Sequence, residues 1–268
     1  SGGNYNVTVG DEAGTAITTG DNNTFVGYTA GDANTTAGNN TAVGYASLTA
    51  NTTGALNVAV GALALDANQT GAANTAVGYN ALSANTGDGA TAVGKDALEL
   101  NTTGANTAVG ANSLATVTSG TLNVAVGNDA LTVNTASNNT AVGASALIAN
   151  TTGDATTAVG KDSMKTNTTG RFNSALGYES LALNTTGANN VALGKAALYS
   201  NTTASNNTAV GHSALIANTT GSNNTAVGFN AGDALTTGIN NTTVGSFSLS
   251  ADTLGKFSVA VGNGALER

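Results

Sequence analysis

The chain has 268 residues and a net charge of −8, with seven Lys or Arg residues against fifteen Asp or Glu. So few basic residues provide no positively charged footprint for nucleic acid. No apolar run approaches the length of about 18 residues that a membrane-spanning helix needs. The absence of cysteine excludes disulfides, thiolate metal sites and cysteine nucleophiles.

One short motif recurs along the chain, and residues 40–44, Asn-Thr-Ala-Val-Gly, are a typical copy. The closing glycines are 17 residues apart, except for three gaps of 16 residues. They are Gly10, Gly27, Gly44, Gly61, Gly78, Gly94, Gly110, Gly127, Gly143, Gly160, Gly177, Gly194, Gly211, Gly228, Gly245 and Gly262. A period this short is typical of a solenoid. It predicts a single repeat domain over residues 1–268.

Each repeat favours β structure over helix. Two glycines and an Asn-Thr-Thr segment in 17 residues disfavour a helix. Thr-Ala-Val is typical of a short strand, with Thr and Val on one face and Ala on the other. Gly permits a corner, Ala-Leu would form a second short strand, and Asn-Thr-Thr-Gly would be the return turn. The predicted fold is therefore all-β, a parallel β-solenoid (β-roll) of 16 coils of about 17 residues, stacked about 4.8 Å apart.

Stacked coils place equivalent residues in columns, and three columns have expected roles. Val and Leu are expected to fill the coil; the representative residues are Val43, Leu48, Val60, Leu65, Val77, Leu82, Val210 and Leu215. Asparagine amides are expected to hydrogen-bond from coil to coil; they are Asn34, Asn51, Asn68, Asn85, Asn101, Asn150, Asn167, Asn184, Asn201 and Asn218. Small alanines would let a second subunit approach closely; they are Ala42, Ala59, Ala76, Ala92, Ala108 and Ala125.

The motif resembles the head repeats of YadA-like trimeric autotransporter adhesins. The matching segments are residues 40–44, Asn-Thr-Ala-Val-Gly, and residues 173–177, Asn-Ser-Ala-Leu-Gly, with their copies. Longer repeats of this type also look like stretches of bacterial surface proteins and phage tail fibres. The resemblance implies a left-handed coil, a homotrimer, and a non-catalytic protein exposed at a cell surface or on a virion tail fibre.

The first predicted strand begins almost at the N-terminus, and the chain stops part-way round the last coil. Neither end resembles a polar cap. Unpaired strand edges can template further pairing, and a head-to-tail contact that does not close generates a filament. The candidate end-to-end contact residues are Ser1, Gly2, Gly3, Asn4, Leu266, Glu267 and Arg268. The alternative is that flanking domains belong to a longer chain.

The sequence offers no constellation typical of catalysis, cofactor binding or metal binding. His212 is the only histidine and lies in a variable column that suits a solvent-facing or subunit-facing surface. Asp96, Asp129 and Asp162 recur two coils apart, about 10 Å from one another by the coil spacing, too far to share a calcium ion. No phosphate-binding loop is present. No enzyme activity and no cofactor are expected.

The predicted function is that of a non-enzymatic structural protein, forming an extracellular rod or head-to-tail filament on a bacterial or phage surface. The expected partners are copies of itself, and a host-surface or glycan receptor is a further possible partner. One alternative is a receptor-binding adhesin head or a tail-fibre shaft belonging to a longer chain. Another is an ice-binding β-solenoid, because threonine rows such as those containing Thr52 and Thr53 could present hydroxyls at regular intervals.

Overall fold

The computed structural model describes residues 3–102 and 104–267, and these contain sixteen three-residue strands and no helix. The strands are parallel, which confirms the prediction of an all-β parallel β-solenoid. The chain divides into two compact units, Ser1–Ser137 and Asn138–Arg268, where the sequence predicted one repeat domain. Each unit is described separately below.

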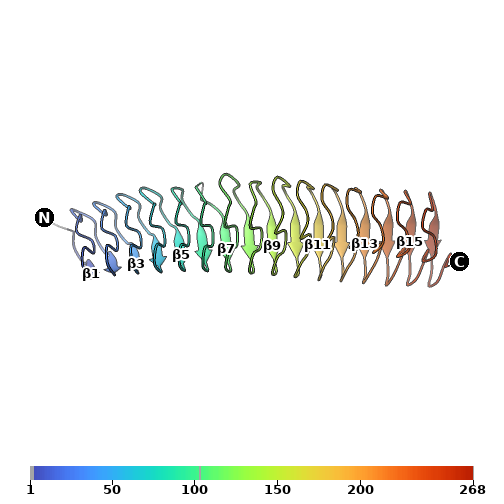
Figure 1. Ribbon diagram of the computed structural model, residues 1–268, viewed down its shortest axis with the longest axis horizontal. Coiled ribbons are helices and arrows are strands. Elements are labelled where there is room, and N and C mark those ends of the chain that lie inside the picture. Colours follow the sequence, from blue (N-terminus) through green and yellow to red (C-terminus); the bar gives the residue numbers. More distant parts are fainter. Residues whose placement is uncertain (1–2, 103, 268) are drawn as a thin grey trace. The chain divides into compact units, whose positions relative to one another are not determined.

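The first unit contains eight parallel strands (Figure 1). They are β1 (Val7–Val9), β2 (Thr24–Val26), β3 (Thr41–Val43), β4 (Val58–Val60), β5 (Thr75–Val77), β6 (Thr91–Val93), β7 (Thr107–Val109) and β8 (Val124–Val126). Each strand pairs with the next in the chain, residue for residue. Two of the shortened repeats lie here, and Thr75 still pairs with Thr91 and Thr91 with Thr107. The turns therefore absorb the missing residues while the strand register is kept.

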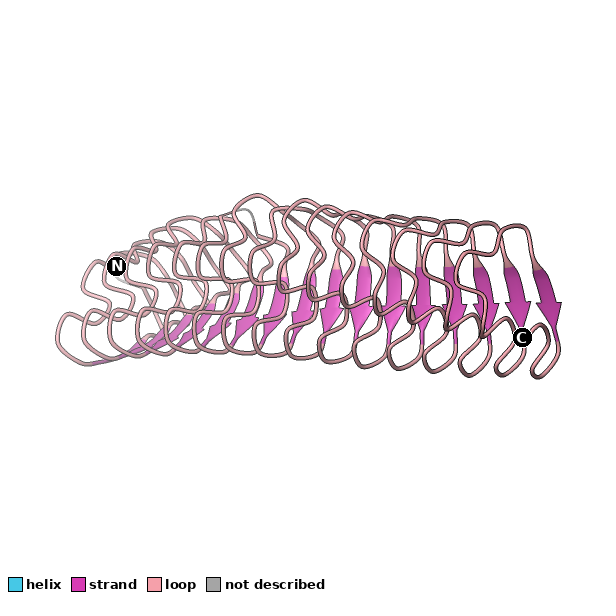
Figure 2. Ribbon diagram, turned by 45° about the vertical axis from the view of Figure 1, so that its right-hand side comes forward, coloured by secondary structure: helices cyan, strands magenta, loops and turns pink. Residues whose placement is uncertain are grey.

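The second unit repeats this architecture with eight more strands. They are β9 (Thr140–Val142), β10 (Thr157–Val159), β11 (Ser174–Leu176), β12 (Val191–Leu193), β13 (Thr208–Val210), β14 (Thr225–Val227), β15 (Thr242–Val244) and β16 (Val259–Val261). The same one-to-one parallel pairing connects neighbouring strands. In each unit the strands form one side of the coil, and turns and loops form the rest (Figure 2).

The strand faces are reversed relative to the prediction. The alanine at the centre of each typical strand points into the coil, and all six candidate interface alanines are completely buried within the single chain. They are Ala42, Ala59, Ala76, Ala92, Ala108 and Ala125. The valines face outward instead: Val43 is 36% exposed, and Val60, Val77 and Val210 are partly exposed. The predictions of a valine core and an alanine subunit interface are therefore wrong.

The reason for this reversal is the width of the coil. Each typical coil contributes one large side chain to the interior, a leucine or methionine four residues after the marker glycine. Leu48, Leu65, Leu82 and Leu215 all have zero exposure, so this half of the core is where the sequence placed it. The strand opposite the leucine has room only for alanine.

The start of the first unit shows how the interior volume is kept constant. Phe25 replaces the strand alanine and is completely buried. Gly14 and Gly31 stand where neighbouring coils have leucine, and a Cβ added at Gly31 would come within 2.6 Å of the Phe25 ring. A larger strand residue is thus accommodated by removing the facing leucines, as close packing requires.

The second predicted strand, Ala-Leu, is a turn. Leu48 has φ of 54° and Ala46 has φ of 50°, so two left-handed residues alternate with right-handed ones. Leucine rarely adopts positive φ because Cβ crowds the backbone. Here the conformation directs the side chain into the core and leaves the backbone amide free to donate to the next coil, as Leu48 N does to the Ala64 carbonyl at 2.9 Å.

The marker glycines make the corner after each strand. Gly44 has φ of 140°, and a Cβ added there would lie 2.5 Å from the carbonyl oxygen of Gly61 in the next coil. Both the dihedral angle and the close approach of the backbone of the next coil exclude any side chain.

Candidate functional site

Buried asparagines connect the coils within each unit. The ten predicted ladder residues are all completely buried, and along most of the column each side-chain amide donates to the carbonyl oxygen of the asparagine in the preceding coil. The donor–acceptor pairs are Asn51–Asn34, Asn68–Asn51, Asn101–Asn85, Asn167–Asn150, Asn184–Asn167, Asn201–Asn184 and Asn218–Asn201, at 2.7 to 3.1 Å. These bonds satisfy polar groups that would otherwise be costly to bury.

The ladder is interrupted where the chain places an apolar residue in the column. Leu235 occupies the position one coil after Asn218, and the buried Oδ1 of Asn218 has no hydrogen-bond partner among the described residues. Val117 occupies the position one coil after Asn101, but there Asn106 Nδ2 donates to Asn101 Oδ1 at 3.0 Å. The interruption at Val117 is thus compensated, and the one at Leu235 leaves an unsatisfied acceptor. The buried Oδ1 of Asn68 is also without a partner in the described part of the chain, although Asn85 follows it in the column, and Asn85 Nδ2 donates to the Gly87 carbonyl instead.

A second asparagine ladder was missed by the sequence reasoning. It is formed by the asparagine that opens the motif, and its members are Asn23, Asn40, Asn57, Asn74, Asn106, Asn123, Asn139, Asn173, Asn190, Asn207, Asn224 and Asn241. Asn40 is typical: its backbone N–H donates to Asn23 Oδ1 at 2.9 Å, and its Nδ2 donates to the carbonyl of Gly54 at 2.9 Å. The regular recurrence of Asn immediately before the strand was the available signal.

Threonines of the return turn form a third set of coil-to-coil bonds. Thr52 Oγ1 donates to the carbonyl of Gln69 at 3.0 Å, and Thr185 Oγ1 donates to that of Thr202 at 3.0 Å. The hydroxyl hydrogens of such threonines are therefore used within the solenoid, and this row is not available to present donors to an external lattice.

The outward strand residues form the first candidate functional surface, called here the strand face. It consists of the first and third residue of each strand. In the first unit these are Val7, Thr24, Thr41, Val58, Thr75, Thr91, Thr107 and Val124, with Val9, Val26, Val43, Val60, Val77, Val93, Val109 and Val126. In the second unit these are Thr140, Thr157, Ser174, Val191, Thr208, Thr225, Thr242 and Val259, with Val142, Val159, Leu176, Leu193, Val210, Val227, Val244 and Val261.

No residue of the strand face is charged, although the chain has 22 charged residues. The third strand position is always Val or Leu and is partly or fully exposed. The hydroxyls of Thr75, Thr91 and Thr107 have no hydrogen-bond partner within the described parts of the chain. Each unit therefore presents an apolar strip with a row of unused hydroxyls beside it.

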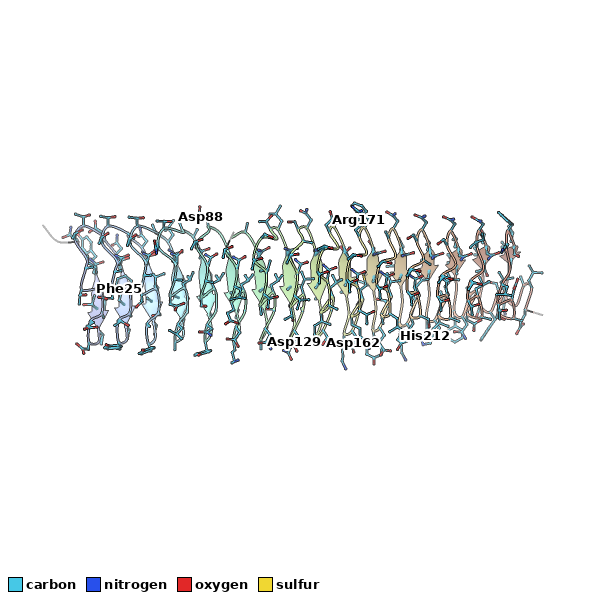
Figure 3. All side chains as sticks on the ribbon, turned by 45° about the horizontal axis from the view of Figure 1, so that its top comes forward. Phe25, Asp88, Asp129, Asp162, Arg171 and His212 are labelled. Atoms are coloured by element: carbon cyan, nitrogen blue, oxygen red, sulfur yellow. The ribbon has the colours of Figure 1, made fainter. Side chains whose placement is uncertain are left out.

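The residue after the marker glycine forms the second candidate surface, called here the corner column. In the first unit it includes Tyr28 and Tyr45, whose rings stack with centroids 5.7 Å apart. In the second unit, Figure 3 places His212 and Asp162 along one edge of the coils and Arg171 on the opposite edge. His212 is exposed and stacks on Phe229 with centroids 5.3 Å apart, as expected for a residue in a variable outer column.

The other residues singled out from the sequence take structural roles. Asp129 accepts a hydrogen bond from Asn112 Nδ2 at 2.9 Å, and Asp96 pairs with Lys95. Asp162 pairs with Lys161 at 3.7 Å. Among residues 3–102 and 104–267, no group of three or more His, Asp or Glu side chains could hold a metal ion.

The candidate end-to-end residues are only partly described. Ser1, Gly2 and Arg268 lie outside the described residues. Asn4 is exposed, and its carbonyl accepts from Asn22 N at 3.0 Å, so this segment continues the coil stack. Leu266 is 56% exposed, and Glu267 N donates to the carbonyl of Gly264 at 3.3 Å.

In the described part of the chain, no helix has the length and apolar character needed to cross a membrane.

Comparison with known proteins adds no relative from which a function could be transferred: no protein-family model and no curated protein matches the sequence.

Proposed function

We propose that this chain is a non-enzymatic structural protein that works as a homo-oligomer, with copies packed against one another through the strand face. The observation that carries the proposal is the contrast between two exposed columns. The corner column varies freely among Tyr, Asp, Ala, Lys, Asn, His, Phe and Ser. The outer valine column, equally outside the coil, contains only Val and Leu over sixteen repeats.

A solvated column has no reason to keep an apolar branched side chain in every repeat. Strand propensity favours valine, but it favours Thr and Tyr as well, and neither appears in this column. One unit's strand face covers on the order of 400 Å², from eight strands about 4.8 Å apart and three residues wide. Contiguous apolar patches of a few hundred Å² mark interaction sites on soluble proteins. Because the strand face carries no charge, two copies of it can pack together without electrostatic repulsion.

The resemblance to trimeric autotransporter head repeats and to tail-fibre repeats refines this proposal. It makes a homotrimer of left-handed coils the expected assembly. It also makes an extracellular rod on a bacterial cell surface, or the shaft of a virion tail fibre, the expected setting. A receptor-binding head within a longer adhesin is the alternative role for the same assembly.

The test is the oligomeric state of strand-face variants. Val93 and Val109 are adjacent in the valine column and are each 37% exposed, so lysine can extend into solvent from either position. We expect wild-type protein to sediment as an oligomer and V93K/V109K to sediment as a monomer with an unchanged β-sheet circular dichroism spectrum. The matched control is Y79K/A111K, which adds the same charge to the corner column and should leave the oligomer intact.

A monomeric wild-type protein at concentrations up to the millimolar range would contradict self-association through this face. Loss of the oligomer in Y79K/A111K as well would assign the effect to net charge rather than to the strand face.

Ice binding is a second candidate, and a specific observation supports it. The strand face carries hydroxyls without partners, as on Thr75, Thr91 and Thr107, in a regular row with valine methyl groups beside it. The first threonine of the return turn, by contrast, uses its hydroxyl internally, as Thr52 and Thr185 do. Thermal hysteresis in wild-type protein, lost in V93K/V109K and kept in Y79K/A111K, would favour this function; no hysteresis in the wild type would dismiss it.

A further inference from the structure

Six of the seven Lys and Arg residues lie in the second unit, and Lys95 is the only one in the first. Within the second unit the corner column concentrates cationic and aromatic side chains. Five consecutive coils present Lys161, Tyr178, Lys195, His212 and Phe229, and all five residues are exposed. These five residues are called here the basic edge.

Two pairs of neighbouring side chains in the basic edge interact along the coil axis. The Lys161 ammonium is 6.0 Å from the centroid of the Tyr178 ring, and the His212 and Phe229 rings stack at 5.3 Å with an interplanar angle of 19°. The faces of the stacked rings are therefore turned toward each other. Adjacent coils place successive side chains about 4.8 Å apart.

The middle of the basic edge contains one lysine, Lys195, that no acidic group in the described part of the chain neutralises, and His212 lies one coil further on. Lys161 is paired with Asp162, and Glu179 accepts a hydrogen bond from the Tyr178 hydroxyl, which raises the pKa of that tyrosine. Lys195 is followed by Ala196 and His212 by Ser213, and neither basic residue has an ion-pair partner among the described residues. Ser213 Oγ forms a hydrogen bond with His212 Nδ1 at 3.0 Å, so the Nε2 atom of His212 is left to bind a ligand.

We infer that the basic edge is a binding site for a linear anionic polysaccharide, which lies along the coil axis across Lys195 and His212. A row of regularly spaced donors suits a polymer whose carboxylate or sulfate groups and hydroxyls also recur at regular intervals. The aromatic neighbours supply apolar contact for sugar rings at their exposed edges. A charge-assisted bond from Lys195 and a hydrogen bond to His212 Nε2 provide most of the affinity.

Single-stranded nucleic acid is the competing polyanion, and the geometry disfavours it. Binding of that kind uses aromatic faces on which bases stack. Here one face of His212 is covered by Phe229, and one face of Tyr178 is approached by Lys161.

The experiment measures binding of the whole chain to four immobilised probes at physiological salt. They are polygalacturonate, dextran sulfate, neutral dextran and polyadenylate. We expect binding to at least one anionic polysaccharide and none to neutral dextran. K195Q/H212Q should weaken that binding about tenfold or more, the effect of losing one charge-assisted contact and one hydrogen bond.

The matched control is K95Q, which removes the corresponding lysine of the corner column in the first unit. Lys95 is already paired with Asp96, so this substitution should change binding less than twofold. The inference is overturned if no anionic polysaccharide binds, if K195Q/H212Q binds as tightly as wild type, or if polyadenylate is the preferred probe. Lys195, His212 and Lys95 lie outside the strand face, so these substitutions leave that face unchanged and this test is separate from that of the strand face.

Discussion

The buried asparagine ladder allows a quantitative comparison of two residues that the sequence makes look identical. Asn184 and Asn218 occupy the same column, and both side chains have zero exposure. Asn184 takes part in three hydrogen bonds: its Nδ2 donates to Asn167 Oδ1 at 2.7 Å and to the Gly187 carbonyl at 3.0 Å, and its Oδ1 accepts from Asn201 at 2.8 Å. Asn218 takes part in two, because Leu235 leaves its Oδ1 without a donor.

Asn184→Ala should therefore lower the free energy of unfolding by about 3 kcal/mol, at about 1 kcal/mol for each hydrogen bond lost. Asn218→Ala should cost at least about 1 kcal/mol less, since it loses one bond fewer and also removes an unsatisfied buried acceptor. Asn184→Leu reproduces the Leu235 arrangement and keeps the branched shape of the side chain, so it leaves no cavity. It should still be destabilising, which would separate the hydrogen bonds from the effect of a cavity.

The measurement is equilibrium urea unfolding, with the slope checked for constancy across the variants because stacked repeats can unfold in parts. Hydrogen exchange at the amides of β11 and β12 provides a local readout that does not require a two-state transition. Equal destabilisation by Asn184→Ala and Asn218→Ala would refute the reasoning, since the two sites differ in the bond that Leu235 removes.

Three further predictions follow from the coil geometry. Gly177→Ala should destabilise the protein by about 3 kcal/mol or prevent folding, because φ is 140° and the new Cβ would lie 2.4 Å from a carbonyl oxygen of the next coil; thermal melting checks this. Leu181→Ala should lower the free energy of unfolding, measured in urea, by about 3 kcal/mol, because Leu181 is completely buried. Leu176→Ala, on the strand face and 52% exposed, should lower it by less than about 1 kcal/mol at low protein concentration. Similar losses for the two variants would contradict the placement of Leu and Ala inside the coil. Desolvation raises the pKa of Asp66 and Asp233 above the ordinary value of 3.8, so each favours the folded state below pH 3.8 and loses that contribution as pH rises through the folded-state pKa. D66N/D233N should therefore raise the melting temperature at pH 7 but not at pH 3. An equal gain in melting temperature at both pH values would contradict this prediction.

The composition of the repeat was sufficient to predict the class of fold. A 17-residue period cannot hold two helices, and a column of glycines at a fixed place requires a corner with positive φ, as Gly44 has. The leucine column was recognisable as core because a large aliphatic residue recurs at one position, and Leu48 and Leu215 are buried. Uncharged amides recurring in a column could be paired across coils from chemistry alone, as Asn51 and Asn34 show.

The direction in which each strand faces was decided only by the tertiary structure. Thr-Ala-Val separates Val from Ala by the alternation of the strand, but both faces are apolar, so hydrophobicity alone favours the larger valine as the buried residue. The coil has space for one large side chain per layer, and Leu48 enters that space from a turn in a left-handed conformation that leucine seldom adopts. Once the leucine is inside, the facing strand can bury only Ala42, and Val43 turns outward to form the surface on which the proposed function depends.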